Sequence, residues 1–264
     1  MVGTPKISVI SPSKNTGRFA KETIGTILDQ TYTNWEHIVV DGQSTDETIS
    51  VFKKYKHIRM ISEKDSGPDE AFRKGLVMAR GEYVMLCCIS DGYLDSNWFR
   101  KCADILENNH DISLVWGLPQ YMSEIGYLSR ITREDFFDNP PPGNREFLNF
   151  WLKTYFHLPE GNFCIRKRVM DECFPIVNAK NAIEACHFLT FDYNFNVLGY
   201  LPYFIPVVAN YGRVHADAMG QLQLKKHLMQ GWVKKYQQSV DLYKEKLLEG
   251  KIIHHFRNGM GKIL

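Results

Sequence analysis

The chain has 264 residues, of which 44% are hydrophobic and 23% are charged, a composition typical of globular proteins. Its net charge of +2 excludes a nucleic-acid-binding protein that works through overall charge. No stretch approaches the roughly 20 apolar residues of a membrane-spanning helix, and residues 1–5 lack the shape of a signal peptide. We therefore expect one α/β domain of a cytoplasmic protein without a nucleic-acid partner.

In the first half of the chain, short apolar runs alternate with segments whose apolar residues recur at helical spacing. The predicted elements, in order, are a strand at 6–11, a helix at 19–30, a strand at 35–40, a helix from the capping box at 44–47 to residue 52, a strand at 58–61, a helix at 68–79, a strand at 82–89, a helix at 95–108 and a strand at 112–116. This alternation predicts parallel βαβ units with right-handed crossovers.

The pattern loosens after about residue 120. The proline-rich segment 139–143 predicts a loop that joins two halves of one domain. Beyond it, the spacing predicts helices at 145–154, 166–173 and 184–198 and a strand at 203–209. The aromatic residues of 184–198 indicate that this helix is buried.

Polar residues follow four predicted strands at their carboxyl ends, which is where open α/β sheets bind ligands. These residues are Ser11, Pro12 and Ser13, then Asp41 and Gly42, then Glu63 and Asp65, and finally Ser90, Asp91 and Gly92. Asp and Ser also form ordinary turns and helix caps. Acids at three successive strand ends nevertheless favour a ligand-binding crevice at this edge of the sheet.

The chain has six cysteines and no CxxC pair; the cysteines are at positions 87, 88, 102, 164, 173 and 186. In a cytoplasmic protein we expect them to be free thiols that are buried as small apolar side chains. The alternative is a zinc site formed by Cys164, Cys173, Cys186 and His187, although the spacings match no common zinc motif.

Several ordered motifs of the chain resemble the amino-terminal signature of family 2 glycosyltransferases. They are Ile7-Ser8-Val9-Ile10-Ser11-Pro12, Thr23-Ile24-x-x-Ile27-Leu28-x-Gln30-Thr31-Tyr32, Val39-Val40-Asp41-Gly42-Gln43-Ser44-Thr45-Asp46-x-Thr48 and Ser62-Glu63-Lys64-Asp65-Ser66-Gly67. The likeness covers about residues 5–95 and continues more weakly to about residue 216. The chain has neither a GxGxxG nor a Walker motif, which argues against the two commonest nucleotide-binding alternatives.

The resemblance implies a GT-A fold at 1–216, which is a Rossmann-like mixed α/β sheet with helices on both faces, followed by a helical tail at 217–264. Residues from about 5 to 117 would form the nucleotide-sugar-binding half, and residues from about 140 to 216 the acceptor half. The implied activity is inverting transfer of a sugar from a nucleoside diphosphate sugar, expected to be UDP-linked, to a glycan or lipid-linked glycan in surface polysaccharide synthesis.

In the family, the turn after the first strand and the acid after the second strand contact the nucleotide. A carboxylate in that place, here Asp41, can accept the imide N–H of uracil or a ribose hydroxyl. The expected donor-binding residues are Pro12, Ser13, Asp41, Asp65, Arg73, Lys74, Ser90, Asp91 and Arg213. The cations among them would pair with the diphosphate, although Arg73 and Lys74 could instead form a solvated helix face.

The acidic motif after the fourth strand is where the family binds a divalent cation, Mn²⁺ or Mg²⁺, that neutralises the leaving diphosphate. Here the motif is Ser90-Asp91-Gly92, and Gly92 stands where the family has a second acid. Either Asp91 holds the metal with water and phosphates, or cations such as Arg213 replace the metal, or the protein is weakened or inactive. His215, in a basic segment that resembles the family's, is the second expected metal or phosphate contact.

The acceptor side is expected at Phe191-Asp192-Tyr193-Asn194, which resembles the family's acidic helix start. Inversion needs one general base for the acceptor hydroxyl, and Asp192 is the predicted base. The alternative for Asp192 is a buried, hydrogen-bonded acid. Glu184 is the reserve base, and the expected acceptor-binding residues are Glu160, Asn162 and Glu184.

The tail from 221 to 264 holds nine Lys or Arg residues and three Asp or Glu residues. Apolar residues recur along it at helical spacing from Leu222 to Leu247, with lysines among them. Such a basic amphipathic helix can lie on an anionic membrane surface, which would make the protein peripheral at the inner face of the plasma membrane. The alternative is a helix that packs on the domain or on a second subunit of a homo-oligomer.

Two other functions are consistent with the sequence. A non-catalytic protein that binds a nucleotide or a glycan on the same fold is favoured by Gly92 and by Asn194, which stands where the family often has a second acid. A sugar nucleotidyltransferase would carry a dense, glycine-rich basic loop after the first strand, whereas residues 11–18 contain only Lys14, Gly17 and Arg18 of that kind.

Overall fold

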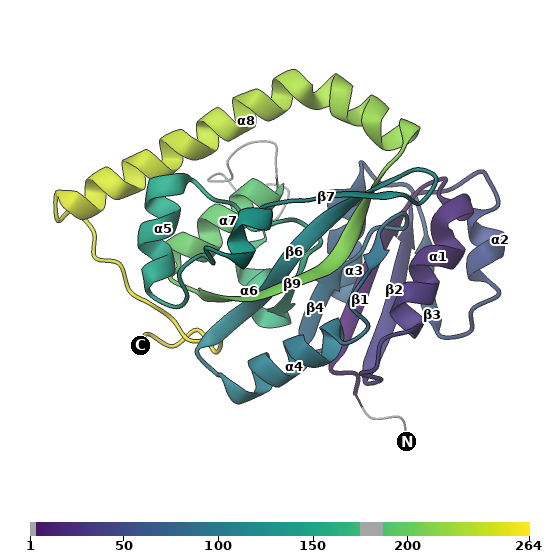
Figure 1. Cartoon of the computed structure of the whole chain (residues 1–264), viewed down its shortest axis with the longest axis horizontal. Helices are drawn as coiled ribbons and strands as arrows, with labels where there is room; N and C mark the ends of the chain where they lie inside the picture. The colour runs from purple at the N-terminus through teal and green to yellow at the C-terminus, as the bar shows by residue number, and fades with distance from the viewer. Residues whose placement is uncertain (1–3, 175–186) are drawn as a thin grey trace.

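The structure is a computed structural model that describes residues 4–174 and 187–264, with the backbone alone for 187 and 217–228. Within these residues, nine strands form a single sheet (Figure 1). Across the sheet the strands follow in the order β3 (Ile58–Ser62), β2 (Trp35–Asp41), β1 (Ile7–Ser13), β4 (Tyr83–Leu86), β8 (Phe163–Arg166), β6 (Ile112–Ser123), β9 (Leu201–Val214) and β5 (Gly92–Tyr93), while β7 (Leu128–Ile131) pairs with β6.

The first half of the sheet is parallel, as the alternating sequence pattern predicts. β1 lies between β2 and β4, and β2 lies between β1 and β3. Because these strands run in the same direction, Ser13, Asp41 and Ser62 reach one edge of the sheet in register. The strand ends that the sequence predicts as a ligand-binding edge are therefore neighbours in space.

The second half of the sheet mixes strand directions. β8 pairs antiparallel with both β4 and β6, whereas β6 and β9 are parallel to each other. β7 and β8 are absent from the predicted elements, and β6 and β9 extend beyond the predicted 112–116 and 203–209. Three apolar residues and an arginine directly before a helix, as in β8, cannot be distinguished by periodicity from the start of that helix.

Helices cover both faces of the sheet, as predicted (Figure 1). They are α1 (Gly17–Leu28), α2 (Thr48–Phe52), α3 (Pro68–Met78), α4 (Trp98–Asn108), the 3₁₀ helix η1 (Glu134–Phe137), α5 (Glu146–Thr154), α6 (Lys167–Cys173), α7 (His187–Val197) and α8 (Ala216–Leu248). Apolar clusters join α3, α5, α6 and α7 to one face and α1, α2 and α4 to the other. The helix predicted at 184–198 is confirmed over 187–197, and 184–186 lie outside the described residues.

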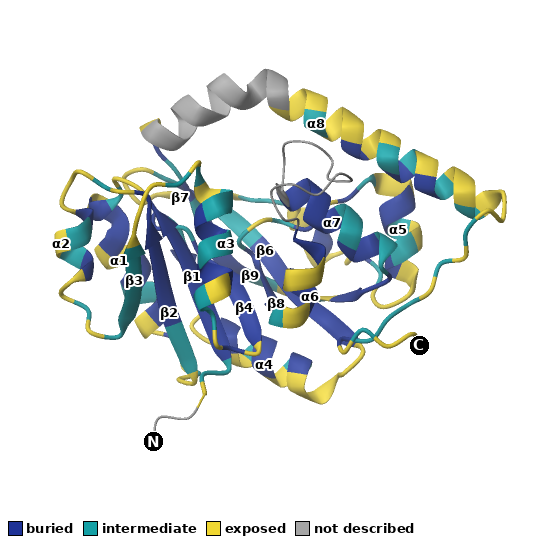
Figure 2. Ribbon diagram, turned by 180° about the vertical axis from the view of Figure 1, so that it is seen from behind, coloured by how far each residue is buried: buried dark blue, intermediate teal, exposed yellow. Residues whose placement is uncertain are grey.

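The alternation of side chains along each strand divides the core between the two faces. Ile10 of β1 and Val84 of β4 pack in one cluster with Phe72 of α3. Val9, the neighbour of Ile10, packs in another cluster with Phe99 of α4. Figure 2 shows the central strands as almost wholly buried, and this burial includes Ser13 and Asp41 at the carboxyl ends of β1 and β2.

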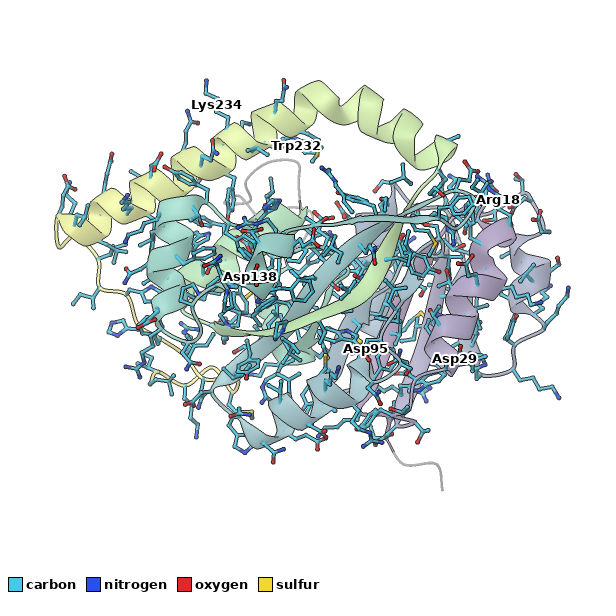
Figure 3. All side chains as sticks on the ribbon, viewed as in Figure 1. Arg18, Asp29, Asp95, Asp138, Trp232 and Lys234 are labelled. Carbon is cyan, nitrogen blue, oxygen red and sulfur yellow. The ribbon has the colours of Figure 1, made fainter. Side chains whose placement is uncertain are left out.

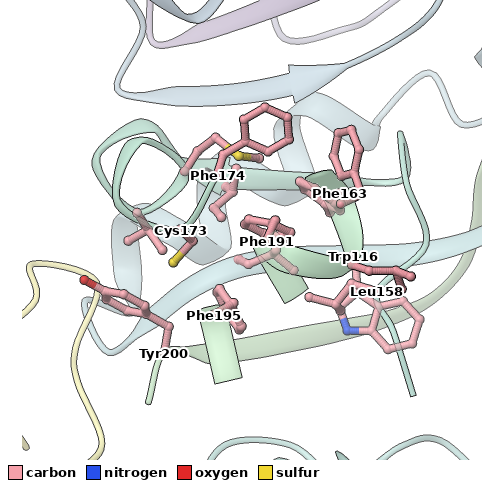
Figure 4. Close-up of a cluster of buried hydrophobic side chains, with 14 of the residues drawn as sticks. Trp116, Leu158, Phe163, Cys173, Phe174, Phe191, Phe195 and Tyr200 are labelled. Carbon is pink, nitrogen blue, oxygen red and sulfur yellow. The ribbon is translucent and has the colours of Figure 1, made fainter. Parts of the chain in front are cut away.

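Aromatic side chains hold the second half of the domain together (Figure 4). The rings of Phe163 in β8 and Phe191 in α7 stack with centroids 5.5 Å apart. The ring of Trp116 in β6 lies 5.3 Å from that of Phe156. Such pairs contribute about 0.5–1.5 kcal/mol each beyond the burial of their area. Phe156 belongs to loop 155–161, so the cluster positions this loop.

α8 packs three of its described side chains against the domain. Tyr236, Val240 and Tyr243 are buried there, and α8 contacts α5 and α7. Trp232 points from the helix toward the domain, whereas Lys234 points away from it (Figure 3). No helix in the described part of the chain is both long and apolar enough to cross a membrane.

Val240→Ala should lower the free energy of unfolding by about 1–3 kcal/mol, because it removes two carbon atoms from a site with no solvent exposure and leaves a cavity. Urea denaturation measures the change. Leu242→Ala, on the exposed side of the same helix, is the control, with an expected change below about 0.5 kcal/mol. Equal changes in the two variants would contradict the packing of α8 on the domain.

Candidate active site

Residues of the loop between β4 and β5 line two cavities. The first, which we call the β1 cavity, has a volume of about 360 Å³ and lies between the end of β1 and the start of α3. The second, which we call the aromatic cavity, has a volume of about 570 Å³ and is lined by β6, β9 and loop 155–161. Ser90 lines the β1 cavity and Asp91 lines the aromatic cavity. Adjacent residues therefore face the two spaces.

Residues from four separate segments line the β1 cavity. Those expected from the sequence are Pro12, Ser13, Asp65, Ser90 and His215. Lys14, Thr16 and Ser66 also line it and were not predicted as site residues. The signal that could have identified Lys14 is its place directly after the Pro12-Ser13 turn, where a cation can reach a bound phosphate.

Asp41 is buried at the end of β2 and is held by donors from its own chain. Its carboxylate accepts the backbone N–H of Ser44 at 2.9 Å, the hydroxyl of Ser62 at 2.7 Å and the hydroxyl of Ser44. A carboxylate has about four acceptor positions, so it can accept one further donor. In the sheet Asp41 pairs with Ser13, which lines the β1 cavity, but Asp41 itself does not line it.

Gly42 lets Asp65 approach the end of β2. A Cβ atom at position 42 would lie 2.8 Å from Oδ2 of Asp65. Oδ1 of Asp65 accepts the N–H of Gly67 at 3.0 Å, at the start of α3. One acid therefore joins β2 and α3 at the edge of the β1 cavity.

The two predicted cations of α3 have different surroundings, and neither lines the two cavities. Lys74 forms ion pairs with Glu63 at 2.9 Å and Glu70 at 3.3 Å. Nε and Nη2 of Arg73 are buried without a hydrogen-bond partner in the described part of the chain, and its Cζ lies 5.9 Å from the ring centre of Phe174. Lys74 is thus engaged in surface ion pairs, whereas two nitrogen atoms of Arg73 find no acceptor among residues 4–174 and 187–264.

Asp91 keeps one carboxylate oxygen without a hydrogen bond. Its Oδ1 accepts the backbone N–H of Arg213 at 2.9 Å and the hydroxyl of Ser90 at 3.4 Å. No hydrogen bond reaches Oδ2 from residues 4–174 or 187–264. Burial raises the pKa of Asp91 to about 6, although the hydrogen bonds and the charge of Arg213 oppose the shift.

Arg213 is buried and holds the loop that carries Asp91. Its Nε donates to the carbonyl of Ser90 at 3.0 Å, and its Nη1 donates to the carbonyls of Ser123 and Glu124 at 3.2 and 3.0 Å. Its Nη2 forms an ion pair with Glu22 at 2.6 Å. The guanidinium is therefore engaged within the chain and lines neither cavity.

Position 92 has no room for a side chain. A Cβ atom there would lie 2.6 Å from the hydroxyl oxygen of Tyr211 and 2.7 Å from its Cζ. Tyr211 is buried, and its hydroxyl donates to Glu22 at 3.2 Å. Gly92, where the resemblance leads us to expect a second acid, thus lies against a tyrosine that fills the space beside it.

A divalent cation fits this site only together with a substrate. Among the described residues, no group of three or more His, Cys, Asp and Glu side chains lies close enough to hold a metal ion. Mg²⁺ usually keeps several waters and binds through one or two carboxylates together with substrate phosphates. Oδ2 of Asp91, which has no hydrogen bond from the described residues, could serve as such a carboxylate ligand.

The described cysteines are free thiols, as predicted. Cys87, Cys102, Cys164 and Cys173 are buried, and Cys88 is partly buried. Cys186 and the side chain of His187, which belong to the alternative zinc site, lie outside the described residues.

Asp192 lies behind the wall of the aromatic cavity. It is buried in α7, where it accepts the N–H of Leu158 at 3.0 Å and the hydroxyl of Tyr236. Burial raises the pKa of Asp192, and the charge of His157 and the hydrogen bond from Tyr236 oppose the shift. Asp192 therefore ties α7 and α8 to loop 155–161 and lines neither cavity.

The three expected acceptor-binding residues are not together. Asn162 is buried, and its amide donates to the carbonyl of Gly117 in β6, which fixes the start of β8. Glu184 lies outside the described residues. Glu160 lines the aromatic cavity.

Glu160 shares the aromatic cavity with rings from two segments. These are Trp116 and Tyr121 of β6, and Tyr155, Phe156 and His157 of the same loop as Glu160. Desolvation within the cleft and the nearby Asp69 raise the pKa of Glu160 to about 7. The aromatic residues were not predicted, because in the sequence they cannot be distinguished from core residues.

Known proteins resemble both the sequence and this fold. The chain is 41% identical over 202 residues to TarP of Staphylococcus aureus (strain N315), a poly(ribitol-phosphate) beta-N-acetylglucosaminyltransferase, and this match covers 67% of the chain and 59% of TarP. The crystal structure of S. aureus TarS 1–349 in complex with UDP-GlcNAc has a TM-score of 0.61, 18% identity, and coverage of 80% of this chain and 59% of TarS 1–349. The structure of the mannosyltransferase PcManGT from Pyrobaculum calidifontis, in complex with GDP-Man and Mn²⁺, has a TM-score of 0.60 and 18% identity. This match covers 85% of our chain and 61% of the PcManGT chain.

These structural neighbours confirm the predicted GT-A fold. Two other curated relatives are much longer than the matched region, which spans 34% and 23% of their lengths. The sequence model of glycosyl transferase family 2 matches residues 8–174, more than half of the chain. The chain therefore belongs to glycosyl transferase family 2.

Proposed function

We propose that this chain is an inverting glycosyltransferase that moves a sugar from a nucleoside diphosphate sugar to a glycan acceptor in surface polymer synthesis. The observation that carries the proposal is that Ser90 lines the β1 cavity and Asp91, its neighbour in the chain, lines the aromatic cavity. A nucleotide in the first cavity and an acceptor hydroxyl in the second would reach the same carboxylate. Direct displacement needs such an arrangement, because donor and acceptor must be aligned at one carbon atom.

A UDP-linked donor is supported by the likeness to TarS, which was crystallised with UDP-GlcNAc. Asp41 can accept the imide N–H of uracil or a ribose hydroxyl, and Asp65 and the Pro12-Ser13 turn lie at the same edge of the sheet. Lys14 brings a cation into the β1 cavity. Lys14 is thus the cation that this proposal places beside the diphosphate.

We further propose Mn²⁺ or Mg²⁺ as the cofactor. PcManGT was solved with Mn²⁺, and Oδ2 of Asp91 has no hydrogen bond in the described part of this chain. His215 lines the β1 cavity and would be the second protein contact. A bound cation would neutralise the diphosphate as it leaves.

The aromatic cavity supports an acceptor rich in hydroxyl groups. Rings such as Trp116 and Tyr155 offer large apolar faces to the C–H groups of a sugar or polyol. TarS and TarP are named for transfer of N-acetylglucosamine to poly(ribitol phosphate). We propose an acceptor of the same class, a surface glycan or a polyol-phosphate polymer.

We also propose that the protein works in the cytoplasm and touches the inner face of the membrane through the outer side of α8. Lys234 and Lys246 are exposed there, and because Tyr236, Val240 and Tyr243 are buried against the domain, the contact would be electrostatic. The chain should sediment with vesicles that contain phosphatidylglycerol, less so in high salt, and Lys234→Glu/Lys246→Glu should weaken this binding. Equal binding to neutral vesicles, or none to either kind, would contradict it.

The first test is the melting temperature of the purified chain with UDP, GDP, dTDP or CMP, each with Mn²⁺ or with EDTA. A ligand present at 100 times its Kd stabilises the folded state by about 2.7 kcal/mol. We expect a rise with UDP that needs Mn²⁺. A rise that persists in EDTA would assign the charge neutralisation to Lys14 without a metal. No rise with any nucleotide would overturn the donor site.

A non-catalytic binding protein is the second candidate, favoured by Gly92 in place of a second acid. It would bind a nucleotide or a glycan without turnover. Incubation with UDP-GlcNAc and poly(ribitol phosphate) separates the two functions. Release of UDP that depends on the acceptor supports the transferase, whereas UDP binding without release from any of a panel of UDP-sugars supports the second candidate.

A further inference from the structure

The hairpin of β6 and β7 forms one side of the aromatic cavity. Among the nine strands, β7 pairs with β6 alone, and it lies beside the outer half of β6 (Figure 1). Tyr121 of β6 is exposed and lines the cavity, and Thr132 and Arg133, which follow β7, line it too. We call Tyr121 together with residues 128–133 the β7 border. The cavity thus opens to the surface beside an edge strand.

Arg130 is an exposed cation on the β7 border. Its Cζ lies 5.5 Å from the ring centre of Tyr121. Within residues 4–174 and 187–264, Arg130 forms no hydrogen bond or ion pair. A guanidinium that lies over an aromatic face keeps the N–H donors at its edges open, and these donors match the geometry of an oxyanion. Arg130 is therefore placed to bind an anion just outside the aromatic cavity.

The second arginine of the β7 border is already engaged. Arg133 lines the cavity, but its Nε and Nη2 donate to the carboxylate of Asp135 at 3.1 and 3.0 Å. Its Cζ also lies 3.9 Å from the ring centre of Phe136. In the described part of the chain, Arg130 is thus the arginine of this border whose donors stay open to a ligand.

The interior of the aromatic cavity carries the opposite charge. Asp91 and Glu160 both line it. Burial raises the pKa of Asp91 to about 6, and desolvation together with the charge of Asp69 raises the pKa of Glu160 to about 7, so both are mostly ionised at pH 8. An anion is therefore repelled from the interior and attracted to Arg130, whereas uncharged hydroxyl groups can enter. This arrangement suits a ligand whose hydroxyl groups and negative charges lie on different segments.

The wall between Asp91 and the β7 border is open. Oδ1 of Asp91 accepts the N–H of Arg213, and Gly212, the residue before it, lines the cavity and lies opposite Tyr121 in the sheet. A Cβ atom at position 212 would meet no atom within 4 Å. From β9 through β6 to β7 there are two strand spacings, which together span about 10 Å. One extended ligand can therefore lie beside Asp91 and reach Arg130 at the same time.

We propose that Arg130, supported by the ring of Tyr121, binds a phosphodiester of the acceptor chain outside the aromatic cavity, while a polyol unit of the same chain enters the cavity. The inference rests on the proposed function, and it narrows the acceptor to a polymer in which polyol units alternate with phosphates. An uncharged glycan would leave Arg130 without a ligand. Arg130 acts in binding the acceptor and takes no part in the bond that is formed.

Kinetics of the full chain at pH 8, with UDP-GlcNAc as donor and poly(ribitol phosphate) as acceptor, test this contact. Arg130→Gln should raise the KM for the polymer about 10-fold, because a hydrogen bond to a charged group is lost, and should keep kcat and the KM for UDP-GlcNAc within about twofold. Arg130→Lys, which keeps the charge without the planar fork, should raise it about threefold. Arg100→Gln is the matched control, because Arg100 is exposed over the ring of Tyr32 at 5.6 Å and lines neither cavity.

Calorimetric titration of the full chain with poly(ribitol phosphate) needs neither donor nor turnover. In low salt, Arg130→Gln should raise the Kd about 10-fold. The slope of log Kd against log salt concentration should become shallower by about 0.7, the contribution of one phosphate contact on a single-stranded nucleic acid. An unchanged Kd would overturn the contact. A raised Kd with an unchanged salt dependence would overturn it too, because the loss would then come from packing on Tyr121.

Failure of the proposed function has a different signature. A wild type that binds the polymer through Arg130 but neither binds nor releases UDP would overturn the transferase and leave the phosphate contact on a non-catalytic protein. A wild type that releases UDP with the polymer, while Arg130→Gln does so with the same KM, would overturn the phosphate contact alone. A wild type that does not bind the polymer in low salt would overturn the contact whatever the result with UDP.

Discussion

Asp91→Asn should reduce sugar transfer by about 10³-fold or more and abolish the Mn²⁺-dependent part of UDP binding. Asparagine keeps the size of Asp91, and its oxygen can still accept the N–H of Arg213. It lacks the negative charge that would hold a divalent cation beside the leaving diphosphate. The measurements are UDP release with donor and acceptor, and the melting-temperature rise with UDP in Mn²⁺ and in EDTA.

The same variant should be more stable than the wild type at neutral pH in EDTA. Burial raises the pKa of Asp91 from 3.8 to about 6, so its ionised form is disfavoured in the folded chain, and stability falls as the pH rises through this interval. A neutral asparagine removes this loss. The difference in melting temperature should be largest above about pH 6 and vanish below about pH 4.

Asp104→Asn, an exposed change of the same kind in α4, is the control and should alter neither transfer nor the pH dependence of melting. Loss of activity together with a higher melting temperature would show that Asp91→Asn acts on function and not on folding. If Asp91→Asn kept transfer within about threefold of the wild type, Asp91 would not be the metal–diphosphate contact.

Gly92→Asp should lower the free energy of unfolding by about 3 kcal/mol or more, and should not create a second metal ligand. Any Cβ at this position meets the hydroxyl of Tyr211 at 2.6 Å. Tyr211 cannot move freely, because it is buried and bonded to Glu22, which in turn pairs with Arg213. Urea denaturation gives the stability, and a Mn²⁺ titration followed by melting tests the metal.

A double-mutant cycle shows whether Tyr211 causes this loss. On a Tyr211→Ala background, the cost of Gly92→Asp should shrink by more than about 1 kcal/mol. Gly25→Asp is the matched control, because a Cβ there meets no atom within 4 Å, and its effect should stay within about 1 kcal/mol. Additive effects of the changes at 92 and 211 would rule out the clash, as would tighter Mn²⁺ binding by Gly92→Asp.

The donor side could be predicted well from the sequence. Asp65 and Ser90 follow strands of a regular βαβ pattern, and parallel strands with right-handed crossovers bring their carboxyl ends to one edge. The structure places both in the lining of the β1 cavity. Their roles toward a nucleotide stay predictions, as does that of Asp41, which the same rule places beside the cavity.

The acceptor side could be predicted only in part. Glu160 and Asp192 were both singled out, but their surroundings differ because of residues that no local pattern connects to them. Asp192 is engaged by Tyr236, which lies in a helix that begins after the last strand. Glu160 is held toward the cavity partly by Asn210, which belongs to β9.

The sequence by itself determined the family, the parallel half of the sheet and the acids at its strand ends, because these follow from local periodicity and from the order of elements along the chain. Only the tertiary structure decided which acid faces the aromatic cavity and why position 92 is glycine. Both depend on close contacts between distant segments, Tyr236 with Asp192 and Tyr211 with Gly92. Such a hydrogen bond or steric limit leaves no pattern in either segment alone, because it exists only once the sheet and its helices have packed.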